Sequence, residues 1–464
     1  MAKNLSPWLA QVQDRPAYAL EGDLQTDVAV VGAGIAGIAT AYYLLRNTRF
    51  SVTLVEANRI ARGATGHNAG HLVAYFERPF AEIVEEHGLK AAAHAQHALE
   101  SAWHLLEGII HDGRLTTPLY RMMGYNGCAT PEQLVLWLRT ARCRVQAGLH
   151  AEPLLVADDP SVLREIPAEY EDLFVRVPRR SILELLETED TSYIAALAGP
   201  NGTMNGALFC EEVAAMLLRR FPGRFRVGEY LPVRTVTLEA DHAILACDDR
   251  SIRAGKVVLC TNGFEKFDIE NRAGPEINTS FHALVGGCIG SMSAHLELPG
   301  RPPVTHCYYQ ESSTKSDMYH YLLRRPFQLQ DRRLANLLCV GDVLKLLPEG
   351  EVYDRYREVP DSAREEMRAF ARSTFRHCPE QIREDFVWHG LMCYTPDRIR
   401  RIGFEPRNRT LLYNLGCNGI GMLPSVYGGS RIAELLSRSR VQKTIFDPRD
   451  PEDSSPPPRR PPAA

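Results

Sequence analysis

The 464-residue chain lacks the features that mark several classes of protein. It has no basic excess, since 53 Lys and Arg stand against 57 Asp and Glu, and nucleic-acid-binding proteins usually carry such an excess or a basic stripe. Its 11 cysteines include no C-x-x-C pair, whereas disulfide-rich secreted domains and structural zinc sites need clustered cysteines. We therefore expect reduced thiols, a cytoplasmic location, no bound metal and no nucleic-acid partner.

Targeting and membrane signals are also missing. The N-terminal segment up to Asp23 has no apolar core and carries three acidic residues, so it does not resemble a signal peptide. Residues 28–45 hold no charge and just reach the length of a membrane span, but three glycines and a turn motif interrupt them. We interpret this segment as a strand, a tight turn and a buried helix, and expect no membrane span.

The C-terminal end changes in composition. Residues 447–464 are rich in proline and charge and show no apolar period. Such a composition cannot bury enough apolar surface to order itself. We therefore predict a disordered tail over residues 441–464.

Near the N-terminus the sequence shows a complete dinucleotide-binding unit, in which a strand, a G-x-G-x-x-G turn, a helix, a second strand and an acidic residue follow one another. Its parts, in order, are a strand at 27–31, Gly32, Gly34 and Gly37, a helix ending near Asn47, a strand at 51–55, and Glu56.

Each part of this unit has a physical task. Gly32 allows the tight turn, Gly34 lets the backbone approach a pyrophosphate, and Gly37 lets helix and strand pack closely. The N-terminus of the helix presents free N–H groups and the positive end of its dipole to the phosphates. Glu56 can accept hydrogen bonds from a ribose hydroxyl and repels a 2′-phosphate, which disfavours NADP.

A second glycine-rich segment, Arg-Gly-Ala-Thr-Gly-His-Asn-Ala-Gly-His at 62–71, follows the acidic residue closely. Its small residues offer a second backbone surface against a long cofactor, which a nicotinamide enzyme would not need. The alternative is an ordinary glycine-rich loop.

Together, VVGAGIAGIATAYYLL, Glu56 and GATGHNAG resemble the FAD-dependent D-amino-acid oxidase superfamily, which includes glycine oxidase, monomeric sarcosine oxidase, dimethylglycine dehydrogenase and γ-glutamylputrescine oxidase. Later segments resemble the family in the same order. They are a strand at 256–260 ending in Thr261-Asn262-Gly263, a W-x-G…TPD…IG pattern at 388–403, a strand at 411–415, the loop GCNGIGM at 416–422, and a helix from about Pro424 to Leu436.

The resemblance implies an α/β fold in which an FAD-binding Rossmann-like domain carries an inserted α+β substrate domain built on an antiparallel sheet. We expect residues 25–100, 200–270 and 385–440 to form the composite FAD-binding domain. The substrate domain would then consist of residues 100–200 and 270–385.

The resemblance also implies FAD as cofactor. In the family the loop at 416–422 meets the flavin, where a helix N-terminus stabilises the negative charge of the reduced ring. The expected FAD contacts are Gly32, Ala33, Gly34, Ile35, Ala36, Gly37, Glu56, Ala57, Gly63, Ala64, Thr65, Gly66, His67, Asn68, Ala69, Val233, Thr261, Asn262, Gly263, Gly419, Ile420, Gly421 and Met422. His67 aligns with a histidine that dimethylglycine dehydrogenases bond covalently to the flavin, so it is a candidate for the same bond.

The activity implied is oxidation of the C–N bond of a small amine or amino acid by hydride transfer to flavin, with oxygen or another electron acceptor. The candidate catalytic residues are Tyr394 and His389, and the candidate pocket residues are Tyr319, Tyr321 and Arg324, with His320 beside them. The alternatives are a non-catalytic binding protein on the same scaffold and a NAD-dependent dehydrogenase.

The substrate anchors of well-known relatives are missing. Glycine and D-amino-acid oxidases hold the substrate carboxylate with an arginine at the position of Met392, and monomeric sarcosine oxidase uses a lysine at the position of Leu423. Amines whose polar end lies far from the reacting carbon suit such a site. An anion anchor could still come from Lys315, Arg324, Arg325 or Arg398.

A helix predicted over residues 91–110 places His94, His97, Glu100 and His104 on one face. No carboxylate or cysteine cluster completes a metal site there. A solvated or interdomain helix face is the better interpretation.

Overall fold

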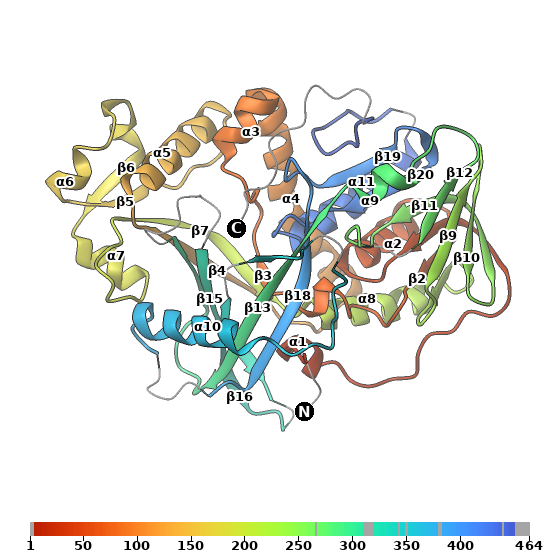
Figure 1. The fold of residues 1–464 in the computed structure, drawn as a ribbon, viewed down its shortest axis with the longest axis horizontal. Coiled ribbons are helices and arrows are strands. Elements are labelled where there is room, and N and C mark those ends of the chain that lie inside the picture. The colour runs from red at the N-terminus through yellow and green to blue at the C-terminus, as the bar shows by residue number, and fades with distance from the viewer. Residues whose placement is uncertain are drawn as a thin grey trace.

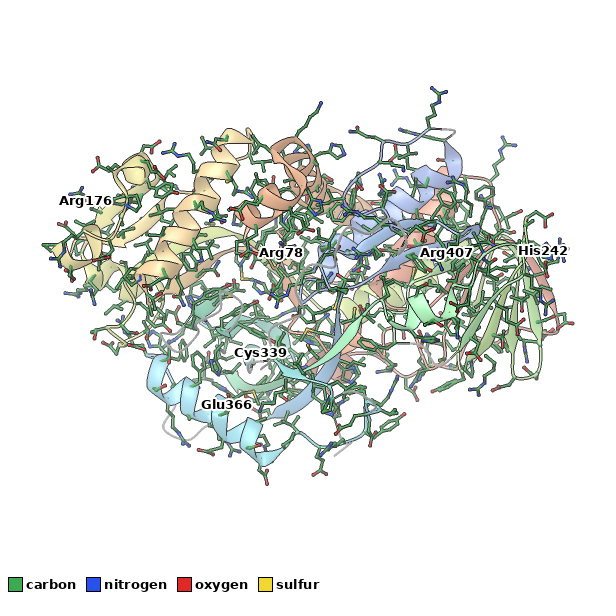
Figure 2. All side chains as sticks on the ribbon, turned by 45° about the horizontal axis from the view of Figure 1, so that its top comes forward. Arg78, Arg176, His242, Cys339, Glu366 and Arg407 are labelled. Carbon is green, nitrogen blue, oxygen red and sulfur yellow. The ribbon has the colours of Figure 1, made fainter. Side chains whose placement is uncertain are left out.

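The computed structural model describes residues 4–264, 267–309, 319–329, 331–341, 344–348, 351–378, 383–438 and 440–450. Two large sheets dominate the described part of the chain, with the first on the right of Figure 1 and the second on the left and in the centre. Arg176 and His242 mark the two ends of the long axis in Figure 2.

The first sheet has a parallel centre in the order β8-β2-β1-β11, and β20 pairs in parallel with the second half of β11. An antiparallel ladder of β9, β10 and β11 continues it on one side. The strands are β1 Leu24–Val31, β2 Val52–Val55, β8 Phe225–Gly228, β9 Val233–Leu238, β10 Ala243–Cys247, β11 Ser251–Leu259, β12 Asp268–Asn271, β19 Arg401–Glu405 and β20 Asn408–Leu415. All four residues of β2 are buried, as expected for a central parallel strand covered on both faces.

Four helices pack into one core beside this sheet, namely α2 Ile35–Asn47, α4 Leu89–Gly113, α8 Gly206–Arg220 and α11 Met422–Ser437. Helices α2 and α11 approach each other closely. A Cβ atom at Gly429 would lie 2.6 Å from backbone atoms of Ala39 and Thr40, so glycine is needed there. This contact joins the middle of α11 to the middle of α2.

The second sheet is mainly antiparallel and runs β17-β13-β16-β15-β14-β4-β7-β5-β6, with β18 beside β13 and β3 beside β7. Its strands are β3 His71–Leu72, β4 Leu119–Cys128, β5 Leu154–Ala157, β6 Phe174–Val177, β7 Ala195–Met204, β13 Gly286–Glu297, β14 Val304–Tyr309, β15 Tyr319–Gln328, β16 Leu334–Gly341, β17 Lys345–Leu346 and β18 Phe386–Tyr394. The remaining helices are α1 Pro7–Ala10, α3 Phe80–His87, α5 Pro131–Gln146, α6 Pro160–Leu163, α7 Arg179–Leu185, α9 Asn278–His282 and α10 Asp361–Thr374. Helix α10 packs on this sheet (Figure 1), where Phe370 contacts Tyr308 and stacks on His320.

The two sheets take their strands from alternating parts of the chain. The first uses residues 24–55, 225–271 and 401–415, and the second uses residues 71–204 and 286–394. We propose that the two sheets mark two domains, of which the first is assembled from three separate segments.

If the two sheets are the two domains, the boundary expected at residue 385 lies after β18 instead. Strand β18 was expected in the FAD-binding domain, but it pairs with β13 over nine residue pairs, from Gly286–Tyr394 to Ala294–Phe386. The strand β3 likewise belongs to the second sheet through β7. A strand near a domain border carries no local signal of which sheet it joins, because both environments favour the same apolar residues.

The prediction of a disordered tail from residue 441 is wrong for its first part. Ile445 and Phe446 are buried, Phe446 stacks on Phe76, and its carbonyl accepts the N–H of Ile402 at 2.8 Å. Asp447 pairs with Arg431 of α11 at 2.7 Å. The two buried apolar residues and the ion pair of Asp447 hold this segment against the protein. Local composition does not reveal such contacts, because the partners lie far away in the chain. Residues 451–464 lie outside the described part.

Helices long and apolar enough to cross a bilayer are absent from the described residues. The uncharged segment 28–45 divides between β1 and α2, as the sequence indicates.

Candidate active site

A cavity of about 850 Å³ lies between the two sheets. Its walls come from the ends of β1 and β2, from the loops that follow β2 and β11, from β13 and β18, and from the loop before α11. Its size falls in the usual range of roughly 300–1,000 Å³ for cofactor and ligand sites.

One end of the cavity is built by the dinucleotide motif. Gly32 has a φ of +99°, and a Cβ atom there would lie 2.8 Å from the carbonyl oxygen of Cys260. Gly34 is the N-cap of α2 and offers no side-chain cap. The carboxylate of Glu56 accepts the N–H groups of Ala33 at 2.8 Å and Asn58 at 2.9 Å, and burial raises its pKa. This end of the cavity therefore combines the N-terminus of α2 with the buried carboxylate of Glu56, which can accept hydrogen bonds.

The loop at 62–70 forms the adjoining wall and rests on helix α1. The hydroxyl of Ser6 donates to the carbonyl of Gly66 at 2.5 Å, and Trp8 Nε1 donates to the carbonyl of Asn68 at 2.5 Å. A Cβ atom at Gly70 would lie 2.8 Å from the ring of Trp8. Sequence reasoning missed this support, although serine followed by proline is a typical start of a helix.

The loop at 416–422, which joins β20 to α11, forms a further wall of the cavity. Gly416, Asn418 and Gly419 have φ values of +85°, +47° and +77°, so the backbone turns sharply before α11 begins at Met422. The side-chain oxygen of Asn418 accepts the N–H of Thr395 at 2.8 Å. This bond ties the loop to the Thr-Pro-Asp segment that follows β18.

A pair of cysteines joins this loop to β18. The sulfur atoms of Cys393 and Cys417 are 3.9 Å apart, and Cys393 Sγ also lies 2.7 Å from Asn262 Oδ1. Hydrogen bonding from Cys393 lowers the pKa of Cys417 to about 6, whereas burial raises the pKa of Cys393 well above its usual value. Cys417 lines the cavity. Nothing in the sequence predicts this pair, because the two residues lie in different motifs.

The opposite end of the cavity is lined by tyrosines. Tyr319, Tyr321 and Tyr394 were expected in the pocket and do line it. Tyr75 and Glu77 line it too, and sequence reasoning missed both. The alternation of His71, Val73, Tyr75 and Glu77, all facing the cavity, is the signal that could have found them.

A family model described as FAD dependent oxidoreductase matches residues 27–435. The chain belongs to this family. As a fold, this oxidoreductase is similar to glycine oxidase from Geobacillus kaustophilus, with a TM-score of 0.65, 17% identity and coverage of 91% of this chain and 98% of the other. It is also similar to L-proline dehydrogenase from P. horikoshii, with a TM-score of 0.66, 14% identity and coverage of 92% and 97%. The predicted fold class is confirmed.

Similarity to curated relatives covers short stretches. The oxidoreductase is 33% identical over 103 residues to a Bacillus subtilis protein named as a candidate Rieske 2Fe-2S iron-sulfur protein, covering 22% of this chain and 20% of that one. It is 36% identical over 77 residues to γ-glutamylputrescine oxidoreductase of Escherichia coli, covering 17% and 18%. The chain thus matches about a fifth of the length of these relatives.

The cavity fits the FAD that the family description names. Thr261 Oγ1, His71 Nε2 and the hydroxyl of Tyr394 are buried without a hydrogen-bond partner among the described residues. All three residues line the cavity, so polar atoms of a cofactor or substrate can satisfy them. Of the sequence-predicted FAD contacts, all but Ala33, Gly37, Gly66 and Gly263 line the same cavity.

The four exceptions have structural roles. A Cβ atom at Gly37 would lie 1.8 Å from the carbonyl oxygen of Gly32, and one at Gly66 would lie 2.3 Å from that of Ala61. Gly263 has a φ of +94° and packs on Val285, and Ala33 is fully buried. These four residues allow the local backbone conformation and packing, and they do not line the cavity.

Two predicted site residues are placed elsewhere. Arg324 does not line the cavity, because its guanidinium is buried in a two-point pair with Glu187 at 2.6 and 2.8 Å. His389 is also turned away, since its ring nitrogens contact the Tyr353 hydroxyl and the Arg357 carbonyl, each at 2.8 Å. Alternation along a strand predicted two faces but not which one meets the cavity.

The other candidate anion anchors lie outside the cavity wall as well. Arg325 is buried against Trp8 and Tyr120, where desolvation lowers its pKa to about 10. Arg398 lies 5.8 Å from the ring of Tyr394 and does not line the cavity. Lys315 lies outside the described residues.

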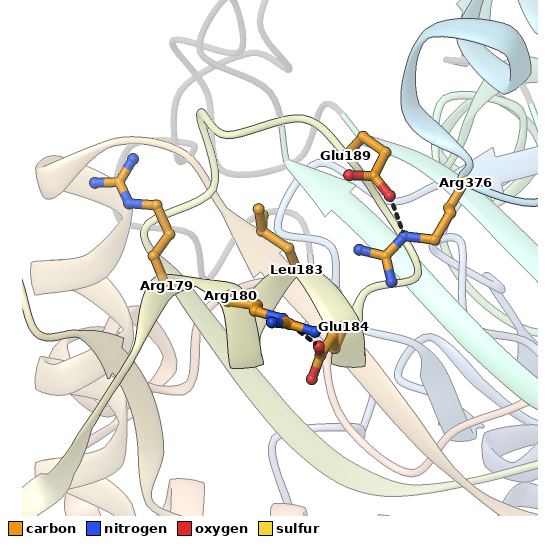
Figure 3. A pocket seen from close by; sticks show the side chains of 6 residues that line it. All are labelled: Arg179, Arg180, Leu183, Glu184, Glu189 and Arg376. Carbon is orange, nitrogen blue, oxygen red and sulfur yellow. Dashed lines mark hydrogen bonds and ion pairs between the residues drawn. The ribbon is translucent and has the colours of Figure 1, made fainter.

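A shallower pocket of about 470 Å³ lies beside α7 (Figure 3). Its arginines are engaged, Arg180 with Glu184 at 2.8 Å and Arg376 with Glu189. It contains none of the motif residues.

As for metals, the described residues contain no group of three His, Cys, Asp or Glu that could hold an ion.

Proposed function

We propose that this oxidoreductase oxidises the C–N bond of an amine or amino acid to an imine, with FAD as the hydride acceptor. The observation that carries the proposal is one cavity with the dinucleotide motif at one end and Tyr319, Tyr321 and Tyr394 at the other. A NAD-dependent dehydrogenase would not need the loop at 416–422. A non-catalytic protein on this scaffold would not need a ligand-sized space beside that loop.

The residues at the motif end would hold the nucleotide part of FAD. Glu56 has acceptor capacity for a ribose hydroxyl beyond its two backbone donors, and the start of α2 suits the pyrophosphate. When bound, the flavin would accept a hydride from the carbon next to the amine nitrogen, and water would hydrolyse the resulting imine. The protein's task is to orient that C–H bond and to keep the reacting amine neutral.

Tyr394 is the best candidate for a polar group beside the reacting atoms. Burial raises the pKa of its hydroxyl well above the usual value, so the group stays protonated and can donate a hydrogen bond. Its oxygen lies 2.7 Å from where a Cβ atom of Gly419 would be, in contact with the loop before α11. We assign it to positioning the substrate rather than to proton removal.

The missing anchors favour an amine over a simple α-amino acid. Met392 lines the cavity where relatives carry a carboxylate-binding arginine, and Leu423 is fully buried where sarcosine oxidase has a lysine. The partial similarity to γ-glutamylputrescine oxidoreductase, whose name describes an amine, supports the same choice.

We also propose a covalent bond between His67 and the flavin, in which an imidazole nitrogen would replace one hydrogen of the 8α-methyl group. The flavin itself would take up the two electrons and pass them to the electron acceptor of the main reaction. His67 lines the cavity, and burial lowers the pKa of its imidazole, which keeps the ring neutral and nucleophilic. Its Nδ1 lies 3.0 Å from the carbonyl oxygen of Gly63.

Anaerobic mixing of the FAD-loaded protein with a panel of primary amines, secondary amines and amino acids tests the main proposal. Bleaching of the flavin absorbance by at least one amine is expected. Admission of air then separates an oxidase, which recovers its colour at once, from a dehydrogenase that needs another acceptor. A protein that cannot be loaded with FAD, or whose flavin no amine or amino acid reduces, would contradict the proposal.

A further inference from the structure

Among the residues that the structure describes, Glu77 contributes a carboxylate to the tyrosine-lined end of the cavity. The hydroxyl of Tyr319 donates to Glu77 Oε1 at 3.2 Å. A Cβ atom at Gly419 would lie 3.1 Å from Glu77 Cδ, so the carboxylate packs directly on the loop before α11. Glu77 therefore lies at the end of the cavity where the substrate is expected to bind.

The surrounding rings add no negative charge of their own. Burial raises the pKa of Tyr75, Tyr319 and Tyr394 well above the usual value, and the nearby charge of Glu77 raises each further. Their hydroxyls therefore stay neutral over the physiological pH range. In the described part of this end, the carboxylate of Glu77 lies next to aromatic rings and hydroxyl groups.

Two arginines that line the cavity have partners at other places. Arg234 pairs with Asp248 at 2.5 Å, and Arg400 donates to Asn414 Oδ1 at 3.0 Å. Glu77 and the tyrosines beside it supply a carboxylate and aromatic rings, which are the groups that bind organic cations.

Two arguments decide which cation this is. An α-amino acid would bring its own carboxylate towards Glu77, and like charges repel. A carboxylate in contact with the reacting amine would raise the pKa of that amine and hold it protonated, whereas hydride transfer needs the neutral form. Glu77 therefore suits a second ammonium group that does not react.

We propose that Glu77 selects substrates with a second positive charge, such as α,ω-diamines, by binding the non-reacting ammonium among Tyr75, Tyr319 and Tyr321. The inference rests on the proposed function and names its substrate class. In this arrangement Tyr319 is a positioning residue, because its hydroxyl orients the carboxylate.

Three ligands of equal chain length test the inference: 1,4-diaminobutane, butylamine and 4-aminobutanoate. Dissociation constants are measured on the anaerobic FAD-loaded protein from the rapid change of flavin absorbance that precedes reduction. The wild-type protein should bind the diamine about tenfold more tightly than butylamine, as expected for a charge-assisted contact, and bind the amino acid most weakly. Equal affinity for the diamine and the amino acid would overturn the inference without any variant.

Three variants locate the selectivity. Glu77→Gln should reduce the ratio of butylamine to diamine dissociation constants to near one, and Tyr319→Phe should reduce it partly. Glu85→Gln, an exposed carboxylate on the neighbouring helix α3, is the matched control and should keep the wild-type ratio. If Glu77→Gln keeps the wild-type ratio of dissociation constants and its flavin is still reduced by amines, the inference about Glu77 is wrong and the proposed function stands. If no amine reduces the flavin of the wild-type protein, the proposed function itself is wrong.

Discussion

Trp8 and Asn68, which are 60 positions apart in the chain, are joined by a hydrogen bond of 2.5 Å from the indole nitrogen to the backbone carbonyl. Trp8 also packs edge to face against Trp388 with ring centroids 6.5 Å apart. The short helix α1 thereby connects the loop that follows Glu56 with the strand β18 of the other sheet. The loop expected to meet the pyrophosphate is held from behind by the N-terminal segment.

We predict that Trp8→Phe weakens FAD retention, because it removes the bond to Asn68 and keeps much of the ring packing. The loss of unfolding free energy should be about 1 kcal/mol, whereas Trp8→Ala, which leaves a cavity, should cost about 3–5 kcal/mol. Thermal unfolding and an FAD titration by fluorescence measure the two effects. Trp137→Phe in α5 is the control; equal FAD affinity in Trp8→Phe and wild type would contradict a supporting role.

We predict that Gly34→Val yields protein without FAD. A side chain at this position would stand at the N-terminus of α2, and its Cβ atom would lie 2.9 Å from Thr65 Oγ1, which accepts the N–H of Ile35. The ratio of flavin to protein absorbance after purification is the measurement. Gly108→Val in α4 is a matched control, because its Cβ atom meets nothing within 4 Å; stoichiometric FAD in Gly34→Val would show the site assignment to be wrong.

Acid precipitation tests the bond between His67 and flavin. If the bond forms, the precipitated polypeptide keeps the yellow colour, and His67→Gln releases it to the supernatant. Mass spectrometry of the peptide that contains His67 should then show the added mass of the flavin. Colour found entirely in the wild-type supernatant means that His67 is a neighbour of the cofactor and no more.

His306 should make folding stability depend on pH. Burial lowers the pKa of its imidazole from 6.5 to about 4, and neither ring nitrogen has a hydrogen-bond partner among the described residues. The unfolded chain takes up a proton below pH 6.5 and the folded chain does not, so stability falls as the pH drops from 6.5 towards 4. Between pH 7 and pH 5 this residue alone should cost about 2 kcal/mol.

Urea unfolding at the two pH values measures this cost. His306→Phe should lose about 2 kcal/mol less than the wild type between pH 7 and pH 5. His94→Gln, at an exposed position of α4, should behave as the wild type. Identical pH dependence in wild type and His306→Phe would contradict the argument.

Cys417 should react with iodoacetamide faster than Cys393 in FAD-free protein. Its pKa is lowered to about 6 by the hydrogen bond from Cys393, so it is mostly thiolate at pH 7. Labelling at a series of pH values followed by peptide mass spectrometry measures both rates. Cys393→Ser exchanges the thiol donor for a hydroxyl and serves as a conservative comparison, whereas Cys393→Ala removes the donor and should shift the Cys417 profile to higher pH. Added FAD should protect Cys417, which lines the cavity.

The features of this protein that its sequence predicts correctly are those that depend on neighbouring residues alone. The turn at Gly32 and Gly34, the close packing at Gly37 and the acid at the end of β2 are fixed by backbone conformation and by spacing along a strand–turn–helix unit. The sequence also predicts the second half of β11, the second half of β20 and most of α11. Such features can be predicted because neighbouring residues impose them on one another.

The tertiary structure alone decided which faces and which distant residues meet. Arg324 and Tyr321 lie on the same strand β15, yet one is buried with Glu187 and the other lines the cavity. The contact of Glu77 with Tyr319, the pair of Cys393 and Cys417, and the support of Asn68 by Trp8 each join residues from separate segments. A strand pattern distinguishes two faces but does not say what covers each one, because that depends on packing between sheets whose strands lie far apart in the chain.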